Sequence, residues 1–135
     1  MTYRYLIPGA PRSKKNSPRI VTNHKTGKPF ILPSKKYSDF EATVSYFLQP
    51  KPKKPIDYPV TVRCLFYMPT RRRVDKSNLE EAIHDILTKY DIIADDNRDI
   101  VASTDGSRVY YDKANPRVEI EISPLQEEYE VWRKT

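Results

Sequence analysis

Five carboxylates lie close together in the sequence, within and just after one segment of helical periodicity. Asp75, Glu81 and Asp85 come first, and the adjacent pair Asp95 and Asp96 follows a short apolar stretch. Mg²⁺ prefers oxygen ligands and usually binds one or two carboxylates together with water and substrate phosphate. Carboxylates held close together repel one another unless a cation neutralises them. These residue types therefore predict a divalent-metal site, where the ion would polarise a scissile phosphate and activate an attacking water.

Cations precede these carboxylates and could hold a neighbouring phosphate backbone. Arg71, Arg72 and Arg73 form an unbroken run, and Lys76 follows shortly after it. Arginine binds phosphate oxygens through parallel N–H groups, which gives orientation as well as affinity. Acidic metal ligands beside this arginine run are the combination expected of a site that cleaves phosphodiester bonds.

A simpler interpretation accounts for the same spacing. In it, Asp75 or Ser77 caps the helix. Glu81 and Asp85 form the solvated side of that helix, and the later aspartate pair forms a turn. Acidic helix faces are common, so spacing alone favours this interpretation over a metal site.

The two halves of the chain carry opposite charge. Residues 1–76 contain 17 Lys and Arg against 4 Asp and Glu, whereas residues 77–135 contain 7 against 14. A basic surplus of this size is the electrostatic footprint of a polyanion-binding protein, and nucleic acid is the natural polyanion. The alternative, which charge alone does not exclude, is a basic surface that only solvates the fold.

A strand over 60–68 and a helix over 78–90 are expected to position the carboxylates and the arginine run. Apolar residues alternate along the strand, and they recur at i, i+3 and i+4 spacing along the helix. The arginine run lies between the two elements. Loops at the end of such rigid elements often carry function.

Shorter strands and another helix precede this unit. A strand over 3–7 stops at Pro8, and segments 20–22 and 30–32 are expected to pair as a hairpin. Ser34 is expected to cap a helix that ends before Pro50. The apolar face of that helix comprises Tyr37, Phe40, Val44, Phe47 and Leu48.

The C-terminal part of the chain predicts two strands and a helix. Segments 100–111 and 118–122 are expected to form a second antiparallel ribbon across a turn at 112–116. Ser123 and Pro124 are expected to begin a last helix. Its capping box and apolar face comprise Gln126, Leu125, Tyr129 and Trp132.

Size and composition favour one domain spanning residues 1–135 with an α+β fold. Hydrophobic residues make up 38% of 135 residues, enough for one core. The single Cys64 forms no internal disulfide, and the N-terminus lacks the apolar stretch of a signal peptide. No apolar run approaches about 18 residues, so a membrane span is excluded. We therefore expect a cytoplasmic protein.

The run RRRVDKSNLEEAIHDIL followed by IIADDN resembles the RusA-type Holliday junction resolvases, which carry a D-x-D-N, helix, D-D arrangement after a strand. The resemblance extends from IPGAPRSKKNSPR through LFYMP to the terminal strands. It implies a RusA-like mixed sheet of hairpins with two main helices and a C-terminal helix. It also implies a homodimer that cleaves four-way DNA junctions by paired symmetric nicks with Mg²⁺, for which Mn²⁺ could substitute. No small-molecule cofactor is implied.

By position, the resemblance assigns site roles to individual residues. Asp75 matches the first motif aspartate and Asp96 the second member of the aspartate pair, so these two are the leading metal ligands. Asn78 matches the motif asparagine and is expected to orient neighbouring side chains or to cap the helix. Asp85 matches the helical aspartate, and Asp95 is a neighbouring metal ligand.

Two positions depart from the family pattern. Ser77 stands where a second aspartate is expected, and Glu81 stands where the family usually has a lysine. We hypothesise that Glu81, one helical turn from Ser77, supplies the missing carboxylate to metal and catalysis. Lys76 or the arginine run would then take the cationic role.

A basic loop after the first strand is expected to follow the DNA backbone without reading bases. The alternative for each of its cations is a solvated side chain. The residues concerned are Arg12, Lys14, Lys15 and Arg19.

Two other functions stay open. One is a catalytically silent protein that binds branched DNA but no longer assembles a metal site, for which Ser77 is the best support. The other is a nuclease with broader preference for branched DNA or flaps, since phosphate contacts alone do not distinguish such substrates.

Several reactive or aromatic residues receive no role in the chemistry. His84 is expected at the boundary of the core, and Cys64 is expected as a small buried hydrophobe. Ten tyrosines are enough to include base-stacking platforms, and among them Tyr110 and Tyr111 are unassigned.

Overall fold

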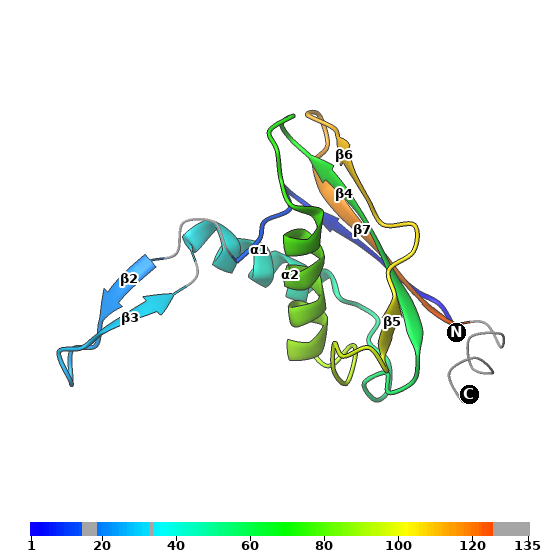
Figure 1. The fold of residues 1–135 in the computed structure, drawn as a ribbon, viewed down its shortest axis with the longest axis horizontal. Coiled ribbons are helices and arrows are strands. Elements are labelled where there is room, and N and C mark those ends of the chain that lie inside the picture. Colours follow the sequence, from blue (N-terminus) through cyan, green and yellow to red (C-terminus); the bar gives the residue numbers. More distant parts are fainter. Residues whose placement is uncertain (15–18, 33, 126–135) are drawn as a thin grey trace.

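The computed structural model describes residues 1–14, 19–32 and 34–125. Its fold is α+β, as predicted, with a mixed sheet and two helices on one side of that sheet (Figure 1). The elements are β1 (Tyr3–Pro8), β2 (Arg19–Thr22), β3 (Pro29–Leu32), α1 (Lys35–Phe47), β4 (Val60–Met68), α2 (Lys76–Lys89), β5 (Val101–Ser103), β6 (Arg108–Tyr111) and β7 (Arg117–Pro124). None of the helices in these ranges is long and apolar enough to cross a membrane.

Strand β4 is central, as its apolar alternation predicted. It pairs with β7 along one edge and with β5 and then β6 along the other, while β7 also pairs with β1. Val60, Val62, Cys64 and Phe66 point to the helices and are buried, whereas the residues between them face the other side of the sheet. The two-residue period therefore separates a covered face from an open face.

The predicted antiparallel ribbon of residues 100–111 and 118–122 is wrong. β5 and β6 run parallel to β4, and β7 lies on the other side of β4 rather than against β6. Val118, Ile120 and Ile122 are buried, which suits a strand with neighbours on both sides better than an edge. The connection at 112–116 thus crosses the end of β4 instead of closing a hairpin.

Helix α1 is capped as predicted, because the Ser34 hydroxyl oxygen accepts a hydrogen bond from the Tyr37 backbone N–H at 3.1 Å. Its predicted apolar face is correct at Tyr37, Phe40 and Val44, which are buried. Phe47 is the exception, with 39% of its surface exposed. The helix ends there, and the next residue, Leu48, turns into the core instead.

The predicted start of a C-terminal helix at Ser123 and Pro124 is wrong. Both residues belong to β7, where Ser123 pairs with Thr61 and Pro124 with Val60 of β4. The rest of that predicted helix, from residue 126 on, lies outside the described residues.

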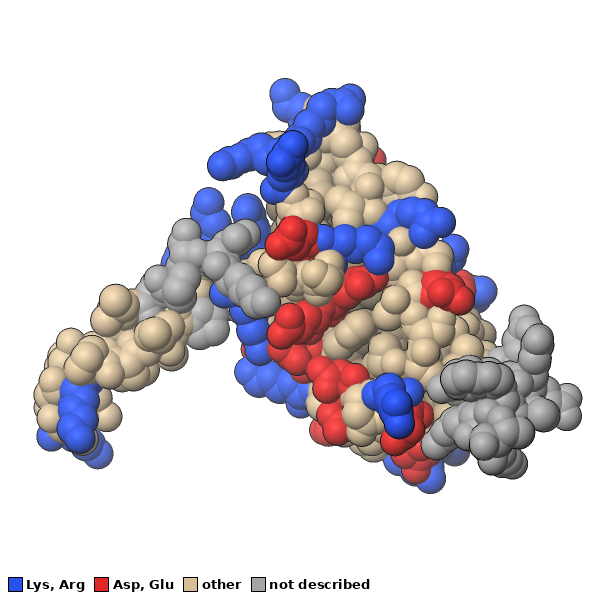
Figure 2. All heavy atoms as spheres, in the orientation of Figure 1, with Lys and Arg blue, Asp and Glu red and all other residues tan. Residues whose placement is uncertain are grey.

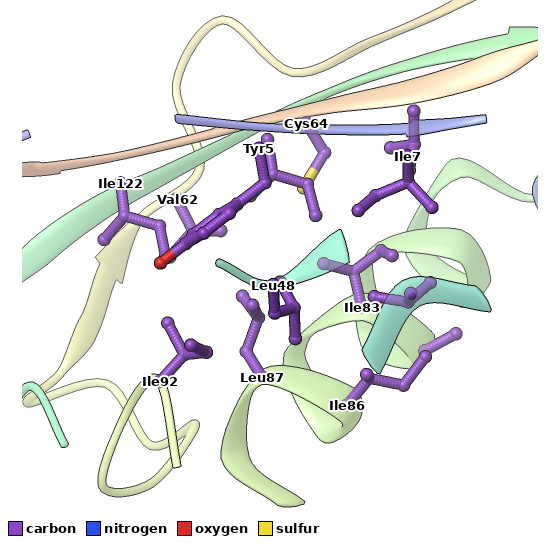
Figure 3. Packing of buried hydrophobic residues seen from close by; sticks show 14 of the residues in the cluster. Tyr5, Ile7, Leu48, Val62, Cys64, Ile83, Ile86, Leu87, Ile92 and Ile122 are labelled. Atoms are coloured by element: carbon purple, nitrogen blue, oxygen red, sulfur yellow. The ribbon is translucent and has the colours of Figure 1, made fainter. Parts of the chain in front are cut away.

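The hairpin of β2 and β3 matches the prediction, with Ile20 paired to Ile31. It projects from the body of the protein beside α1 (Figure 1). The core lies instead between the sheet and the two helices, where Tyr5 and Ile7 face Leu48, Ile83 and Leu87 (Figure 3).

Candidate functional site

Asp75 stands at the N-cap position of α2, but its side chain caps no backbone N–H. Its Oδ2 atom instead accepts a hydrogen bond from the Asn78 side-chain amide at 3.2 Å. The helix begins at Lys76, two residues earlier than predicted, so Ser77 lies in the first turn rather than at the cap. Asp75 therefore occupies the N-cap position that the simpler interpretation gave it, but its carboxylate does not form the capping hydrogen bond.

The end of α2 brings the second group of carboxylates back toward the helix. Asp91 adopts a positive φ of 64°, and the Ile92 N–H donates to the Leu87 carbonyl at 2.9 Å, which is the Schellman ending of a helix. Ile92 and Ile93 are buried in the core. These two anchors hold the following loop against α2.

Asp96 on that loop lies against Asp85 of α2. Desolvation raises the pKa of Asp96, and hydrogen bonding and repulsion from the carboxylates of Asp85 and Asp95 raise it further. The Asp96 backbone N–H also donates to Asp95 Oδ1 at 2.8 Å, and the Asn97 amide donates to Asp95 Oδ2 at 3.0 Å. The structure thus unites three of the five predicted carboxylates.

These carboxylates do not form a complete metal cage. Within the ranges that the structure describes, no three Asp, Glu, His or Cys side chains are arranged to hold one ion. A convergence of all five acids on one ion is therefore not preformed. Since Mg²⁺ commonly takes only one or two carboxylates, the oxygen pair of Asp85 and Asp96 still fits such an ion.

Lys14 connects the basic loop to this acidic pair. Its Nζ atom lies 2.9 Å from Asp85 Oδ2, and both side chains are partly exposed. A cation predicted to bind DNA thus neutralises a carboxylate predicted to act in catalysis.

Three other residues of α2 were singled out from the sequence. Lys76 forms an ion pair with Glu80 at 2.9 Å, one turn along the helix. Glu81 is exposed on the same helix, one turn after Ser77. His84 is half-buried, and desolvation lowers its pKa, so it is a boundary residue as expected.

A groove of about 630 Å³ lies between residues 10–13, the start of α1 and the β4–α2 loop. Among the residues that the structure describes, its lining contains no carboxylate. It contains the cations Arg12, Lys35, Lys36, Arg72 and Arg73. The space-filling view shows Asp and Glu gathered over α2 and the loop after it, with Lys and Arg above them over the β4–α2 loop (Figure 2).

Sequence reasoning missed Lys35 and Lys36. The signal was present, because both directly follow the Ser34 cap, where the helix dipole already favours anions. Of the predicted basic loop, Lys15 lies outside the described residues, and only the backbone of Arg19 is described, in β2.

Cys64 is fully buried on β4, and burial raises the pKa of its thiol. The structure places it in the core as a small hydrophobe, as the sequence predicted.

A small α+β fold that sets paired carboxylates beside a groove of Lys and Arg defines the class of proteins that act on nucleic-acid phosphates. The family model described as endodeoxyribonuclease RusA matches residues 8–123, most of the chain. The chain belongs to the RusA endodeoxyribonuclease family, whose members act on branched DNA junctions. A comparison with curated proteins found no match.

Proposed function

We propose that the protein is a divalent-metal-dependent endodeoxyribonuclease that resolves four-way DNA junctions by paired, symmetric nicks. One observation carries the proposal. The carboxylate of Asp96 lies against that of Asp85, and Lys14, which pairs with Asp85, directly follows the residues that line the cationic groove. Phosphodiester cleavage needs both parts, an acidic centre for the reacting phosphate and cations for its neighbours.

Mg²⁺, or Mn²⁺ in its place, would be held by Asp96, beside Asp85, with one of the other predicted ligands, which are Asp75, Asp95 and Glu81. The donor set suits a hard cation because every donor is a carboxylate oxygen. Desolvation, and then the neighbouring carboxylates of Asp85 and Asp95, raise the pKa of Asp96, and a divalent cation bound there would favour its charged form. When bound, the ion would polarise the scissile phosphate and lower the pKa of the attacking water.

The protein's own side chains then hold the DNA and the acids in place. Asn78 restrains the carboxylate of Asp75 through its amide. Asp85 acts beside Asp96 at the reacting centre. The cations of the groove bind phosphates on either side of the cleavage point. The other cations predicted to contact the same DNA backbone are Arg71, Lys14, Lys15, Arg19 and Lys76.

We propose a homodimer as the active species. A four-way junction has two-fold symmetry, and paired symmetric nicks need two active sites related by the same symmetry. One subunit would supply each site.

The second candidate function is a catalytically silent protein that binds branched DNA. Ser77 in place of a second aspartate supports it, as does the lack of a preformed group of three metal-binding side chains among the described residues. Such a protein would use the same groove and would need no ion.

Nicking of a synthetic four-way junction separates the two functions. With Mg²⁺, the wild-type protein is expected to nick two opposite strands, and Asp96→Asn is expected to lower the rate about 100-fold or more while binding persists. Asp105→Asn, which changes an exposed carboxylate in the β5–β6 turn, is the matched control. Tight binding by the wild-type protein without metal-dependent nicking would favour the silent protein.

A further inference from the structure

The open face of the sheet carries a row of three side chains at directly paired positions. Tyr67 of β4 lies opposite Arg117 of β7 on one side and opposite Tyr110 of β6 on the other. The rings of Tyr67 and Tyr110 are stacked, with centroids 5.2 Å apart and planes 29° apart. The guanidinium of Arg117 lies 3.7 Å from the centroid of the Tyr67 ring.

The inner end of this row is fixed. Arg117 forms ion pairs with Glu119 at 2.8 Å and with Asp112 at 3.0 Å. Its planar group is therefore held over Tyr67, and Tyr67 in turn supports one face of Tyr110. A cation over an aromatic face adds attraction to this packing.

The outer end of the row is open. Strand β6 pairs only with β4 within the described sheet, so no described strand follows it beyond Tyr110. Tyr110 is 46% exposed, an unusual degree for a ring in a stack. An aromatic ring supported on one face and open at the sheet edge is a ready platform for another flat group.

The cationic β4–α2 loop reaches the same edge of the sheet from its other face, because Tyr110 and Tyr111 are consecutive in β6 and point to opposite faces. The guanidinium of Arg71 lies 4.2 Å from the centroid of the neighbouring ring, Tyr111, which is 42% exposed. The Asp112 N–H donates to the Met68 carbonyl at 2.9 Å and ties the end of β6 to the end of β4. The β4–α2 loop and the β6–β7 connection accordingly lie side by side (Figure 1).

We propose that Tyr110 stacks an unpaired nucleobase of a DNA strand that passes over this edge of the sheet, while Arg71, held over Tyr111 on the other face, binds a phosphate of the same strand. The occupant follows from the chemistry of the edge. Every base has a π-face that an aromatic ring accepts, and the guanidinium of Arg71 at the same edge suits a phosphate backbone. The inference rests on the proposed function, because branch points expose bases that an intact duplex keeps stacked.

The test is the binding of a four-way junction with one unpaired 2-aminopurine at its branch point, measured without metal so that no strand is cut. The fluorescence of 2-aminopurine falls when the base stacks. Tyr110→Leu is expected to abolish the quenching and to weaken binding of this junction roughly 5- to 100-fold. Tyr110→Phe keeps the aromatic face and is expected to behave as wild type.

Two controls complete the experiment. Tyr46→Leu removes a ring that is 76% exposed on α1, away from the row, and is expected to change nothing. Binding of a fully paired duplex is expected to be the same for all variants. Sedimentation of each DNA-free variant shows whether Tyr110 instead contacts a second copy of the chain.

Three results overturn the inference: unchanged quenching and affinity in Tyr110→Leu, an equal loss in Tyr110→Phe or Tyr46→Leu, or a change of oligomeric state in Tyr110→Leu. Nicking by the wild-type protein is measured separately with Mg²⁺. A wild-type protein that nicks junctions but shows no stacking by Tyr110 contradicts only this inference, whereas stacking without nicking contradicts only the proposed resolvase activity.

Discussion

At the scale of single residues, the acids of the site differ in how they are restrained. Asp75 is held by one amide hydrogen bond and Asp85 by the ammonium of Lys14, whereas Asp96 is desolvated beside the carboxylates of Asp85 and Asp95, which raises its pKa. Only the surroundings of Asp96 disfavour the charged form of the carboxylate. A carboxylate kept in unfavourable contact is a candidate for function, because binding of a cation would remove the repulsion.

Glu81 tests the hypothesis that a helical glutamate replaces the missing family aspartate. Glu81→Gln is expected to lower Mg²⁺-dependent nicking at least about tenfold, because the amide keeps the shape and loses the charge of the ligand. Asp105→Asn, which changes an exposed carboxylate in the β5–β6 turn, is the control and is expected to retain activity. Rates of nicking by Glu81→Gln equal to those of the wild-type protein would refute the hypothesis.

Two buried tyrosines make a matched pair for stability. The Tyr5 hydroxyl donates to the Pro50 carbonyl at 2.8 Å, whereas the buried Tyr37 hydroxyl has no hydrogen-bond partner in the described structure. Tyr5→Phe is expected to lower the free energy of unfolding by about 1 kcal/mol, and Tyr37→Phe to leave it unchanged or raise it. Urea denaturation measures both, and equal losses would contradict the assignment.

The same Tyr5 gives a pH dependence with a definite sign. Burial raises the pKa of Tyr5 to about 12, from an ordinary value of 10.0 in the unfolded chain. The unfolded state therefore ionises first, so the stability that Tyr5 contributes is complete below pH 10 and is lost between about pH 10 and 12. The difference in unfolding free energy between wild type and Tyr5→Phe should shrink over that pH range. A difference that stays constant would contradict a raised pKa of Tyr5 in the folded protein.

At the scale of elements, the ending of α2 stores backbone strain that can be removed. Asp91 occupies a left-handed conformation that costs most residues roughly 1 kcal/mol and costs glycine little. Asp91→Gly is expected to raise the free energy of unfolding by about 0.5–1 kcal/mol, and Asp91→Ala is expected to give no such gain. Thermal or urea denaturation compares the two, and an equal effect of both substitutions would contradict the Schellman assignment.

Elements with strong local signals were predictable, and their pairing partners were not. The stripe from Leu79 to Leu87 fixed the buried face of α2, and the alternation from Val60 to Met68 fixed the two faces of β4. Alternation says which side of a strand is buried, but not which strand lies beside it. That is why β5 and β6 were predicted without their parallel pairing to β4.

The same limit applies to the site. Asp85 and Asp96 are separated in sequence only by the end of α2 and a short loop, so their meeting was one of the two interpretations that the spacing left open. The ion pair of Lys14 with Asp85 joins residues 71 positions apart and depends on how the N-terminal loop packs. The row of Arg117, Tyr67 and Tyr110 depends on strand order, which no local pattern contains.

At the scale of the whole molecule, folding brings the basic first half of the chain against the acidic second half. The result is a cationic groove next to an acidic centre instead of two separate charged regions. In the proposed function, such a surface would attract DNA at long range and direct its backbone to the acids.

The groove predicts a salt dependence that can be localised. Replacing Arg12, Arg72 and Arg73 together by Gln is expected to weaken junction binding and to reduce the slope of log affinity against log salt by about 0.9 for each phosphate that the variant no longer neutralises. Replacing Lys51, Lys53 and Lys54 in the connector after α1 changes the net charge equally and serves as the control. An unchanged slope in the groove variant would exclude the groove as the DNA-binding surface.

The central claim is that carboxylates of α2 and of the loop after it hold the catalytic ion. The most direct measurement is a crystal structure of the protein soaked with Mn²⁺, with the ion located by its anomalous scattering. We predict one Mn²⁺ coordinated by Asp96 together with Asp85, Asp75 or Glu81. A Mn²⁺ bound elsewhere, or no ion at Asp96 at a concentration that supports nicking, would contradict the account.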